Sequence, residues 1–503
     1  MIALLRSEWT KFRSVRGWLV GIVLAPLVTI GFGALTGSAS QCGYMFPGPD
    51  GQTISGPCSA PTGPGGELVQ DQFYFAHKTL AGNGSITVRM TGLTSSDLQP
   101  WAKSGIILKA AGVRGDGSPR SKIVPGSAYA AMMLTGAHGA RFEWNYVNDA
   151  AGSPGLAPRW LRLARDGDVV TGYDSADGAH WTEVGTATLT GLPSSVQVGM
   201  FAATPGVQQT VRAGDAAVDA TGTFDNVSLT GSVSGGWQGT TVSPPPGPAP
   251  AQDGGPSTGF QQTADGFTVT GMGDIGPDVP GNGGGVSTPI SRTLDGTFAG
   301  LIVVIVIGAI YITAEYRRGM IRTTFAATPA RGQVLVAKAV VLGAVTFVAA
   351  AVGCALAIPI ASHELRAGGN VITPLSTLTY LRVFAGTALV FAGAAILGLA
   401  LGALFRRGVA AVTTGIVVIV VPYFLAVASP GLSTALANWL LRVFPAAALA
   451  VQQTLPVYPQ VSDTYQPFEG FFPLSALAGF AVLIAWTGGA LWLATRQLRR
   501  ADA

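Results

Sequence analysis

Six long apolar stretches constrain this chain more than any other feature of its sequence. They cover residues 17–37, 297–314, 335–361, 382–405, 409–429 and 473–495. At about 1.5 Å per helical residue, each is long enough to cross a hydrocarbon layer roughly 30 Å thick. Stretches of this length and composition are rarely core helices of soluble domains. The sequence therefore predicts six transmembrane helices.

The first stretch has an alternative interpretation, a cleaved signal peptide. A basic start and the small residues Ser38, Ala39 and Ser40 suit a cleavage site, which would leave Gln41 at the mature N-terminus. However, the apolar region is longer than the roughly 7–15 residues of a signal peptide, and further spans follow it. We therefore expect an uncleaved anchor, preceded by an interfacial segment, within residues 1–38.

The distribution of charge predicts the orientation. Charged residues make up 11% of the chain, against about 25% in soluble proteins, which argues against a disordered or nucleic-acid-binding chain. The net charge of +4 divides into +3 for residues 1–38, −7 for residues 39–296 and +8 for residues 297–503. Because Lys and Arg favour the cytoplasmic side, we expect a multi-pass cell-membrane protein with both termini cytoplasmic and residues 39–296 extracellular.

The acidic insert between the first two spans divides by composition. Residues 39–65 form a Gly/Pro-rich linker in which Cys42 and Cys58 are expected to pair in an oxidising exterior, the alternative being two free thiols. Cys354 lies in an apolar span and is expected to serve packing. Three cysteines without metal-ligand spacing predict no metal site.

Residues 66–232 have the pattern of an all-β domain. Apolar residues occupy every second position from Ser85 to Met90, which buries one face of a strand. Two further apolar runs flank Asp166-Gly167-Asp168, a turn that suits a hairpin because Gly tolerates positive φ. Residues 233–296 are rich in Gly and Pro, so we expect a loosely ordered stalk that leads into the second span.

The segment between the second and third spans is the most informative motif. It reads Glu315-Tyr316-Arg317-Arg318-Gly319-Met320-Ile321-Arg322-Thr323-Thr324, followed by Pro329 and Arg331. It resembles the first cytoplasmic loop of ABC-2 type transporter permeases. Residues 7–14 are similar to the interfacial segment of that family, and residues 439–447 to its outer re-entrant region. The alternative is plain positive-inside charge, which explains the arginines but not the Gly, paired Thr and Pro.

The resemblance covers residues 1–38 and 297–503 and implies a role in ATP-driven transport. Residues 315–334 would form a coupling segment seated on a cytoplasmic ABC ATPase. The chain has no Gly-x-x-x-x-Gly-Lys-Ser/Thr phosphate cradle, so it binds no cofactor of its own, and ATP and Mg²⁺ would be bound by the partner subunit. A second permease subunit would complete the path, as a homodimer or heterodimer. Spans with few ionisable groups suit export of a hydrophobic, lipid-like or drug-like cargo.

The β insert resembles concanavalin A-like jelly-roll modules, such as laminin-G-like domains and the C-terminal domain of bacterial β-xylosidases. The likeness lies in residues 101–105, 158–163, 171–181 and 224–229. It implies possible contact with envelope glycan through Trp160, Tyr173 and Trp181. The alternative is that the two tryptophans are core residues. Glu143, Asp149 and Glu183 show no catalytic pairing pattern, so a glycosidase is the least favoured interpretation.

Together these features predict a multidomain membrane protein. A six-helix transmembrane bundle would carry an all-β jelly-roll sandwich inserted between its first and second helices. The leading hypothesis is a non-enzymatic permease subunit that contacts an ATPase, a second permease subunit and membrane lipid, with no nucleic acid. The alternative is a membrane-anchored protein that binds or senses cell-envelope glycan without transport.

Overall fold

The computed structural model describes most of the 503-residue chain. The described residues are 1–47, 53–95, 99–113, 119–205, 207, 208, 215, 216, 218–242, 258–280, 285–327, 330–428, 432–461, 465, 467 and 470–500. The chain divides into two compact units. The helical unit comprises Met1–Cys42, Thr288–Leu455 and Tyr465–Ala503, and the β unit comprises Gly43–Ser287 and Pro456–Thr464.

The helical unit contains the six predicted spans, because each long apolar run forms one continuous helix. Six helices are long and apolar enough to cross a membrane within the described residues. The helical elements are α1 (Ile2–Ser14), α2 (Arg16–Ala39), η1 (Ile290–Leu294), α4 (Thr297–Arg317), α5 (Met320–Ala327), α6 (Arg331–Ala367), α7 (Thr377–Phe405), α8 (Gly408–Ala428), α9 (Thr434–Val443), η2 (Pro445–Gln452) and α10 (Ala476–Arg500), with a short strand β21 (Val371–Ile372). The prediction of six long apolar helices is confirmed, and their length and composition are consistent with a membrane protein.

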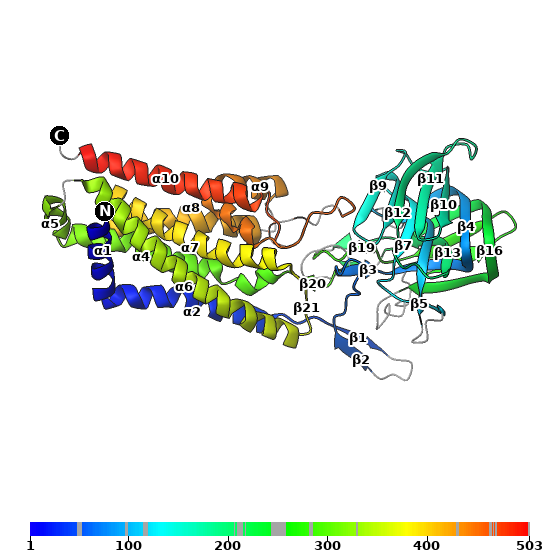
Figure 1. Ribbon diagram of the computed structural model, residues 1–503, viewed down its shortest axis with the longest axis horizontal. Coiled ribbons are helices and arrows are strands. Elements are labelled where there is room, and N and C mark those ends of the chain that lie inside the picture. The colour runs from blue at the N-terminus through cyan, green and yellow to red at the C-terminus, as the bar shows by residue number, and fades with distance from the viewer. Residues whose placement is uncertain are drawn as a thin grey trace. The chain divides into compact units, whose positions relative to one another are not determined.

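The long helices of this unit run side by side, and α1 crosses them at one end (Figure 1). The same end holds α5, the N-terminus of the chain and the C-terminal end of α10. Small residues allow α4 and α7 to approach closely. A Cβ added to Gly398 would lie 2.6 Å from the carbonyl oxygen of Ile305. A Cβ added to Gly308 would likewise clash with the carbonyl oxygen of Ala395. Such close contacts are typical of helices packed in membranes.

The segment between α8 and α10 contains a sharply bent pair of helices. The axes of α9 and η2 differ by 101°, and Pro445 begins η2. Proline lacks the backbone N–H that would continue α9, so α9 ends before Pro445 and the chain bends there. This pair includes residues 439–447, for which we expect a re-entrant region.

Over the described residues, the main sheet of the β unit has 13 strands, and its strand pairs are antiparallel. The strands of the unit are β1 (Gly43–Pro47), β2 (Thr53–Pro57), β3 (Val69–Asp71), β4 (Phe73–Ser95), β5 (Lys103–Val113), β6 (Pro119–Ile123), β7 (Tyr129–Thr135), β8 (Gly139–Trp144), β9 (Asn148–Ala151), β10 (Arg159–Asp166), β11 (Val169–Ser175), β12 (Thr182–Thr188), β13 (Ser195–Ala203), β14 (Val207–Gln208), β15 (Asp215–Ala216), β16 (Ala220–Val242), β17 (Gly259–Gln262), β18 (Phe267–Gly271), β19 (Ile275–Pro277) and β20 (Ser287–Thr288).

Two 23-residue strands, β4 and β16, fold this sheet into a sandwich-like shape. They pair with each other along most of their length. On its other edge, β4 pairs with β13 through residues 74–81 and with β10 through residues 84–90. The change of partner falls at Gly82, whose φ is +69°, a value that glycine adopts without strain. One half of each long strand therefore belongs to each layer.

The layers enclose a core in which side chains alternate as predicted. On β4, Ile86, Val88 and Met90 are buried, and they pack with Leu161 and Leu163 of β10 in one apolar cluster. The hairpin of β10 and β11 turns at Gly167, whose φ is +63°, so the predicted turn is confirmed. Strand β5 is buried on both faces, because a second apolar cluster that includes Ile107 covers its other side.

Strands occupy parts of the two segments for which we expect a stalk and a linker. The expected stalk of residues 233–296 does not begin at 233, because β16 continues to Val242, and β17 and β18 join the same sheet. The glycines there favour close packing: a Cβ on Gly239 would lie 2.9 Å from a ring carbon of Phe260. Likewise, the linker of residues 39–65 contains the hairpin of β1 and β2. Residues 243–257 of the expected stalk lie outside the described residues.

Candidate functional site

The predicted coupling segment forms three helical pieces. Helix α4 ends at Arg317, a turn follows at Gly319, whose φ is +71°, and α5 is a separate helix of 8 residues. Glycine suits this turn because a side chain at positive φ is strained. Arg331 then begins α6. The segment 315–334 is thus the end of one span, a short helix and the start of the next span.

The predicted residues of this segment separate into exposed and inward-facing groups. Arg317, Arg318, Gly319 and Thr323 are exposed, whereas Glu315 and Ile321 are each only 7% exposed. Thr324 is half-buried, and Tyr316 lies beneath the guanidinium of Arg406, 5.8 Å from ring centroid to Cζ. The Arg331 guanidinium donates to the carbonyl of Leu498 at 3.5 Å. The side chain of Arg322 and all of Pro329 lie outside the described residues.

Glu315 belongs to a buried ionic cluster that joins three helices. The Lys338 ammonium of α6 lies 2.7 Å from a carboxylate oxygen of Glu315 and 2.7 Å from one of Glu8 in α1. Lys11 lies 2.9 Å from Glu8 and 3.6 Å from Glu315. The Tyr311 hydroxyl donates to Glu8 at 3.1 Å. We call Glu8, Lys11, Glu315 and Lys338 the helical cluster.

The helical cluster is electrically balanced, with two carboxylates and two ammonium groups. Lys338 is fully buried and Glu8 is 1% exposed, so neither can rely on water for solvation. Burial alone would raise the pKa of Glu8, but Lys338 and Lys11 outweigh it and the pKa is lowered. Burial likewise opposes the charge of Lys11, yet Glu8 and Glu315 raise its pKa. Both groups are therefore held in their charged forms.

Sequence reasoning missed most of this cluster. Lys338 contributes there only to the net positive charge of residues 297–503, and Glu8 only to the interfacial segment of residues 7–14. A lysine four residues into an apolar span was the available signal, since charged residues within spans are rarely unpartnered. The partner could not be identified, because Glu8 precedes Lys338 by 330 residues.

A second candidate site is a hollow on one face of the β unit. Its volume is about 850 Å³, and its lining includes Trp160, Arg162, Tyr173, Thr87 and Ser228. On β10, Trp160 and Arg162 alternate with the core residues Leu161 and Leu163, so they point away from the core. Tyr173 and Thr87 stand directly across from Arg162 on the neighbouring strands.

The structure separates the three predicted glycan contacts. Trp160 and Tyr173 line the hollow and are half-buried. Trp181 is engaged differently: the Arg162 guanidinium lies 3.9 Å from its ring centroid, and its indole N–H donates to the Gly178 carbonyl at 3.1 Å. Arg162 also donates to the Thr87 hydroxyl at 3.0 Å. No acidic partner of Arg162 is present among the described residues.

The β unit buries two lysines on the same face of β5. Lys103 lies 2.8 Å from Asp274 and 3.7 Å from Glu143. Lys109 lies 2.8 Å from Asp71 and donates to the Tyr146 hydroxyl at 2.7 Å. Burial lowers the pKa of Lys109, whereas for Lys103 the acids Asp274 and Glu143 outweigh burial and raise it. We call Lys103 with Asp274 and Glu143, and Lys109 with Asp71, the β-unit pairs.

The remaining predicted residues have structural partners. Cys42 and Cys58 are disulfide-bonded, and Cys354 is a buried free thiol. Glu143 is buried beside Lys103, and Asp149 accepts from Arg141 at 2.8 Å. Over the part of the chain that the structure describes, no group of three or more His, Cys, Asp and Glu side chains is placed to hold a metal ion.

Comparisons with known proteins give only distant likenesses. No protein-family profile and no curated protein matches the sequence. A functionally unknown protein from Saccharomyces cerevisiae is 17% identical over 35% of this chain and 83% of its own, with a TM-score of 0.23. SCP-B, a member of the Eqolisin family of peptidases, is 9% identical over 40% of this chain and 98% of its own, also at 0.23.

A third similar structure is the GH43 protein BlXynB from Bacillus licheniformis. It is 16% identical over 27% of this chain and 26% of its own, with a TM-score of 0.17. Similarities this weak carry no information on what the chain does.

Proposed function

We propose that this chain is the membrane-spanning subunit of an ABC-2 type transporter, exporting a hydrophobic, lipid-like or drug-like cargo. Both termini and α5 are cytoplasmic in this proposal, and the β unit is an extracellular jelly-roll domain of concanavalin-like type. A separate ABC ATPase binds ATP and Mg²⁺ and contacts α5, and a second permease subunit completes the path.

The helical cluster is the observation that carries this proposal. Transmission of force from an ATPase requires a rigid connection between the contacted helix and the spans. In the sequence, α5 begins three residues after the end of α4 and ends four residues before the start of α6, and Lys338 ties the adjacent ends of α4 and α6 to α1. A displacement of α5 therefore moves three helices together.

The exposed side of the segment supplies the contact surface. Arg317, Arg318 and Thr323 are exposed, whereas Ile321 on α5 is buried against the rest of the unit. Lys11 approaches the Thr324 hydroxyl at 3.5 Å, which places the helical cluster next to α5. A cytoplasmic partner can thus bind the arginines without disrupting the buried charges.

The test is co-purification with ABC ATPase subunits of the same organism, followed by measurement of ATP turnover. Arg317→Ala combined with Arg318→Ala is expected to reduce association at least tenfold. Arg442→Ala is the matched control, because Arg442 is also an exposed arginine near a helix end but lies in α9. Unchanged association and turnover in the double variant would contradict the proposal.

The hollow of the β unit favours a second candidate function, recognition of an envelope glycan. Indole and phenol rings beside hydroxyl side chains suit a sugar, which stacks its apolar face and hydrogen-bonds at its rim. The guanidinium of Arg162 adds affinity for a carboxylate-bearing sugar. Binding of soluble uronic-acid oligosaccharides should fall with Trp160→Ala or Tyr173→Ala. Trp237→Ala is the control, because Trp237 packs on Phe267 and is not part of the hollow.

A further inference from the structure

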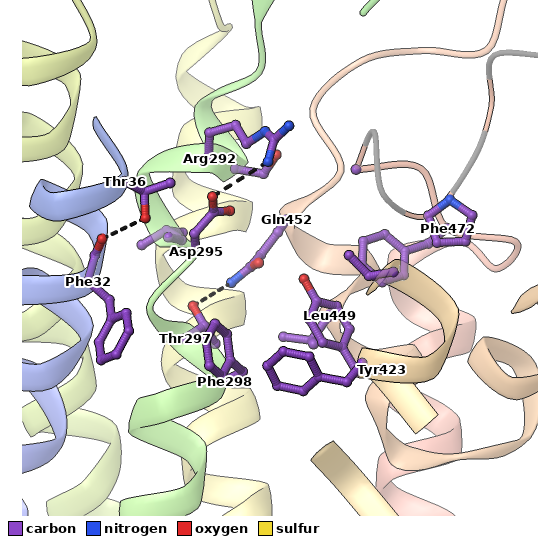
Figure 2. A pocket seen from close by; sticks show the side chains of 16 residues that line it. Phe32, Thr36, Arg292, Asp295, Thr297, Phe298, Tyr423, Leu449, Gln452 and Phe472 are labelled. Carbon is purple, nitrogen blue, oxygen red and sulfur yellow. Dashed lines mark hydrogen bonds and ion pairs between the residues drawn. The ribbon is translucent and has the colours of Figure 1, made fainter. Parts of the chain in front are cut away.

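A cavity of about 260 Å³ lies in the helical unit at the N-terminal end of α4. Its walls come from α2, η1, α4, α8, η2 and the segment that contains Phe472, and they include Phe32, Arg292, Phe298, Phe424 and Gln452. Figure 2 shows the polar groups Arg292, Asp295 and Gln452 gathered above the rings of Phe32 and Phe298. The cavity is therefore amphipathic along its length.

The apolar side of the cavity is a cluster of aromatic rings. The ring centroids of Phe32 and Phe298 lie 6.0 Å apart, and those of Phe298 and Phe424 lie 4.7 Å apart. Phe32 is 45% exposed and Phe424 is 39% exposed, although both belong to helices long enough to span a membrane. Exposed rings at this position give an acyl chain a path into the cavity from the surface of the spans.

The polar side carries both signs of charge in a loose pair. The Arg292 guanidinium lies 3.7 Å from the Asp295 carboxylate, longer than a charge-assisted hydrogen bond, and the two side chains are 47% and 29% exposed. A partly exposed pair of this length contributes little to stability. A ligand that binds both Arg292 and Asp295 therefore loses little free energy when it separates them.

Gln452 adds an oriented acceptor to this side. Its carboxamide nitrogen donates to the Thr297 hydroxyl at 3.1 Å and to the Thr387 hydroxyl at 3.2 Å. Among the described residues no donor reaches its carbonyl oxygen. The cavity thus offers an amide oxygen and a carboxylate to a donor, and a guanidinium to an anion.

We propose that this cavity binds the headgroup of a zwitterionic amphiphile, an amine and a phosphate on one apolar body. The amine lies at Asp295, within reach of the Gln452 carbonyl, the phosphate pairs with Arg292, and the acyl chain runs along Phe32 and Phe298. A purely cationic ligand would sit beside Arg292, and a purely anionic one beside Asp295, so each would meet a like charge. The volume fits a headgroup and not a whole lipid.

This inference rests on the function proposed above only where the bound amphiphile is taken to be the transported cargo. Binding itself requires no ATPase and is measured on the full chain in detergent. A chain that binds the lipid but does not couple to an ATPase would contradict the transport function alone. A chain that couples but does not discriminate between headgroups would contradict this inference alone.

The experiment is isothermal titration with short-chain phosphatidylethanolamine and with phosphatidylglycerol of the same chain length, which lacks the amine. Wild type is expected to bind the ethanolamine lipid at least tenfold more tightly. Asp295→Asn should abolish that preference, and Arg292→Gln should weaken binding of both lipids. The exposed Arg442→Gln should change neither affinity. Equal affinity of wild type for the two lipids, or an unchanged preference in Asp295→Asn, would overturn the proposal.

A charge-exchanged variant separates recognition from folding. In Arg292→Asp combined with Asp295→Arg, both charges remain but exchange places, so the phosphate and the amine each meet a like charge where they bound before. We expect this variant to keep the melting temperature of wild type and to lose the preference for the ethanolamine lipid. A preference as large as that of wild type in this variant would also overturn the proposal.

Discussion

The two units of this molecule both bury lysines, but they use them in different ways. In the β unit, Lys103 and Lys109 each hold a carboxylate from a segment far away in the sequence, Asp274 and Asp71. In the helical unit, Lys338 is shared by two carboxylates on two other helices. Lys103, which also lies 3.7 Å from Glu143, and Lys109 fasten segments to a sheet face, whereas the helical cluster joins three helices.

The difference also concerns access to water. Lys103 and Lys109 are fully buried, and their acidic partners are nearly so. The helical cluster includes Lys11, whose side chain is 41% exposed and already 3.6 Å from Glu315. A lost charge in the helical cluster can therefore be replaced in part by movement of Lys11, but a lost charge in the β-unit pairs cannot.

Lys109→Met is expected to have the largest effect on stability. It leaves the Asp71 carboxylate buried without its cation, which costs about 3–5 kcal/mol. The melting temperature of the β unit in the full chain should fall by on the order of 10 °C in scanning calorimetry. Lys78→Met on β4 is the control, because Lys78 is partly exposed and is expected to change little. A shift no larger than that of the control would show that the β-unit pairs do not hold the unit together.

Asp278 tests whether a buried carboxylate in the β unit needs a lysine. It is 4% exposed, and its Oδ2 has no hydrogen-bond partner among the described residues. Burial raises the pKa of Asp278 to about 6, against about 3.9 in an unfolded chain. The folded state therefore binds more protons between these values, and the β unit should lose up to about 3 kcal/mol as pH rises from about 4 to 6.

Asp278→Asn should remove this loss, which is measured as the difference in melting temperature from wild type across the same pH range. The comparison with wild type is needed because burial lowers the pKa of His77, so its contribution to stability declines as pH falls below about 6.5. In the helical unit the slope from Glu8 is opposite to that from Asp278: its pKa is lowered, so its contribution declines as pH falls below about 4. Identical pH profiles for Asp278→Asn and wild type would contradict the assignment.

Lys338→Met should destabilise the helical unit by about 2 kcal/mol, less than the breaking of a fully buried pair, because Lys11 can approach both carboxylates. Lys11→Met alone should cost under about 1 kcal/mol, as for other partly exposed pairs. The double variant should lose more than the two single losses together. In complex with an ATPase, Lys338→Met is expected to uncouple ATP turnover from cargo. Strict additivity would mean that the four groups do not act as one cluster.

The sequence predicts the helices and strands of both units better than the ion pairs within them. Long apolar runs specify the spans, and alternation with Gly167 specifies the β10–β11 hairpin, because both signals are local. The glycines after residue 232 suggest a stalk, yet they lie in β16, where small size permits close packing. The partners of Lys338 and Lys109 come from distant segments of the chain. The hydrophobic periodicity of the sequence does not indicate such a pairing.

The smallest expected effect on stability distinguishes a binding surface from a structural one in the β unit. Arg162 and Arg165 lie on the same strand, but Arg162 is half-buried on the hollow, whereas Arg165 is 6% exposed. Arg165 donates to three backbone carbonyls, those of Gly167, Pro193 and Ser194. Arg162→Gln should therefore cost under about 1 kcal/mol, and Arg165→Gln about 1.5–3 kcal/mol.

Binding is expected to follow the reverse order. Because the Arg162 guanidinium lines the hollow without an acidic partner among the described residues, Arg162→Gln should weaken binding of a uronic-acid oligosaccharide about tenfold. Arg165→Gln should leave that affinity unchanged, since its donors already serve the turn and the strand end. If instead Arg162→Gln lowered the melting temperature as much as Arg165→Gln did, Arg162 and Trp181 would be part of the scaffold. The exposed side of β10 would then resemble the rest of the β unit, where charge serves only to fasten segments together.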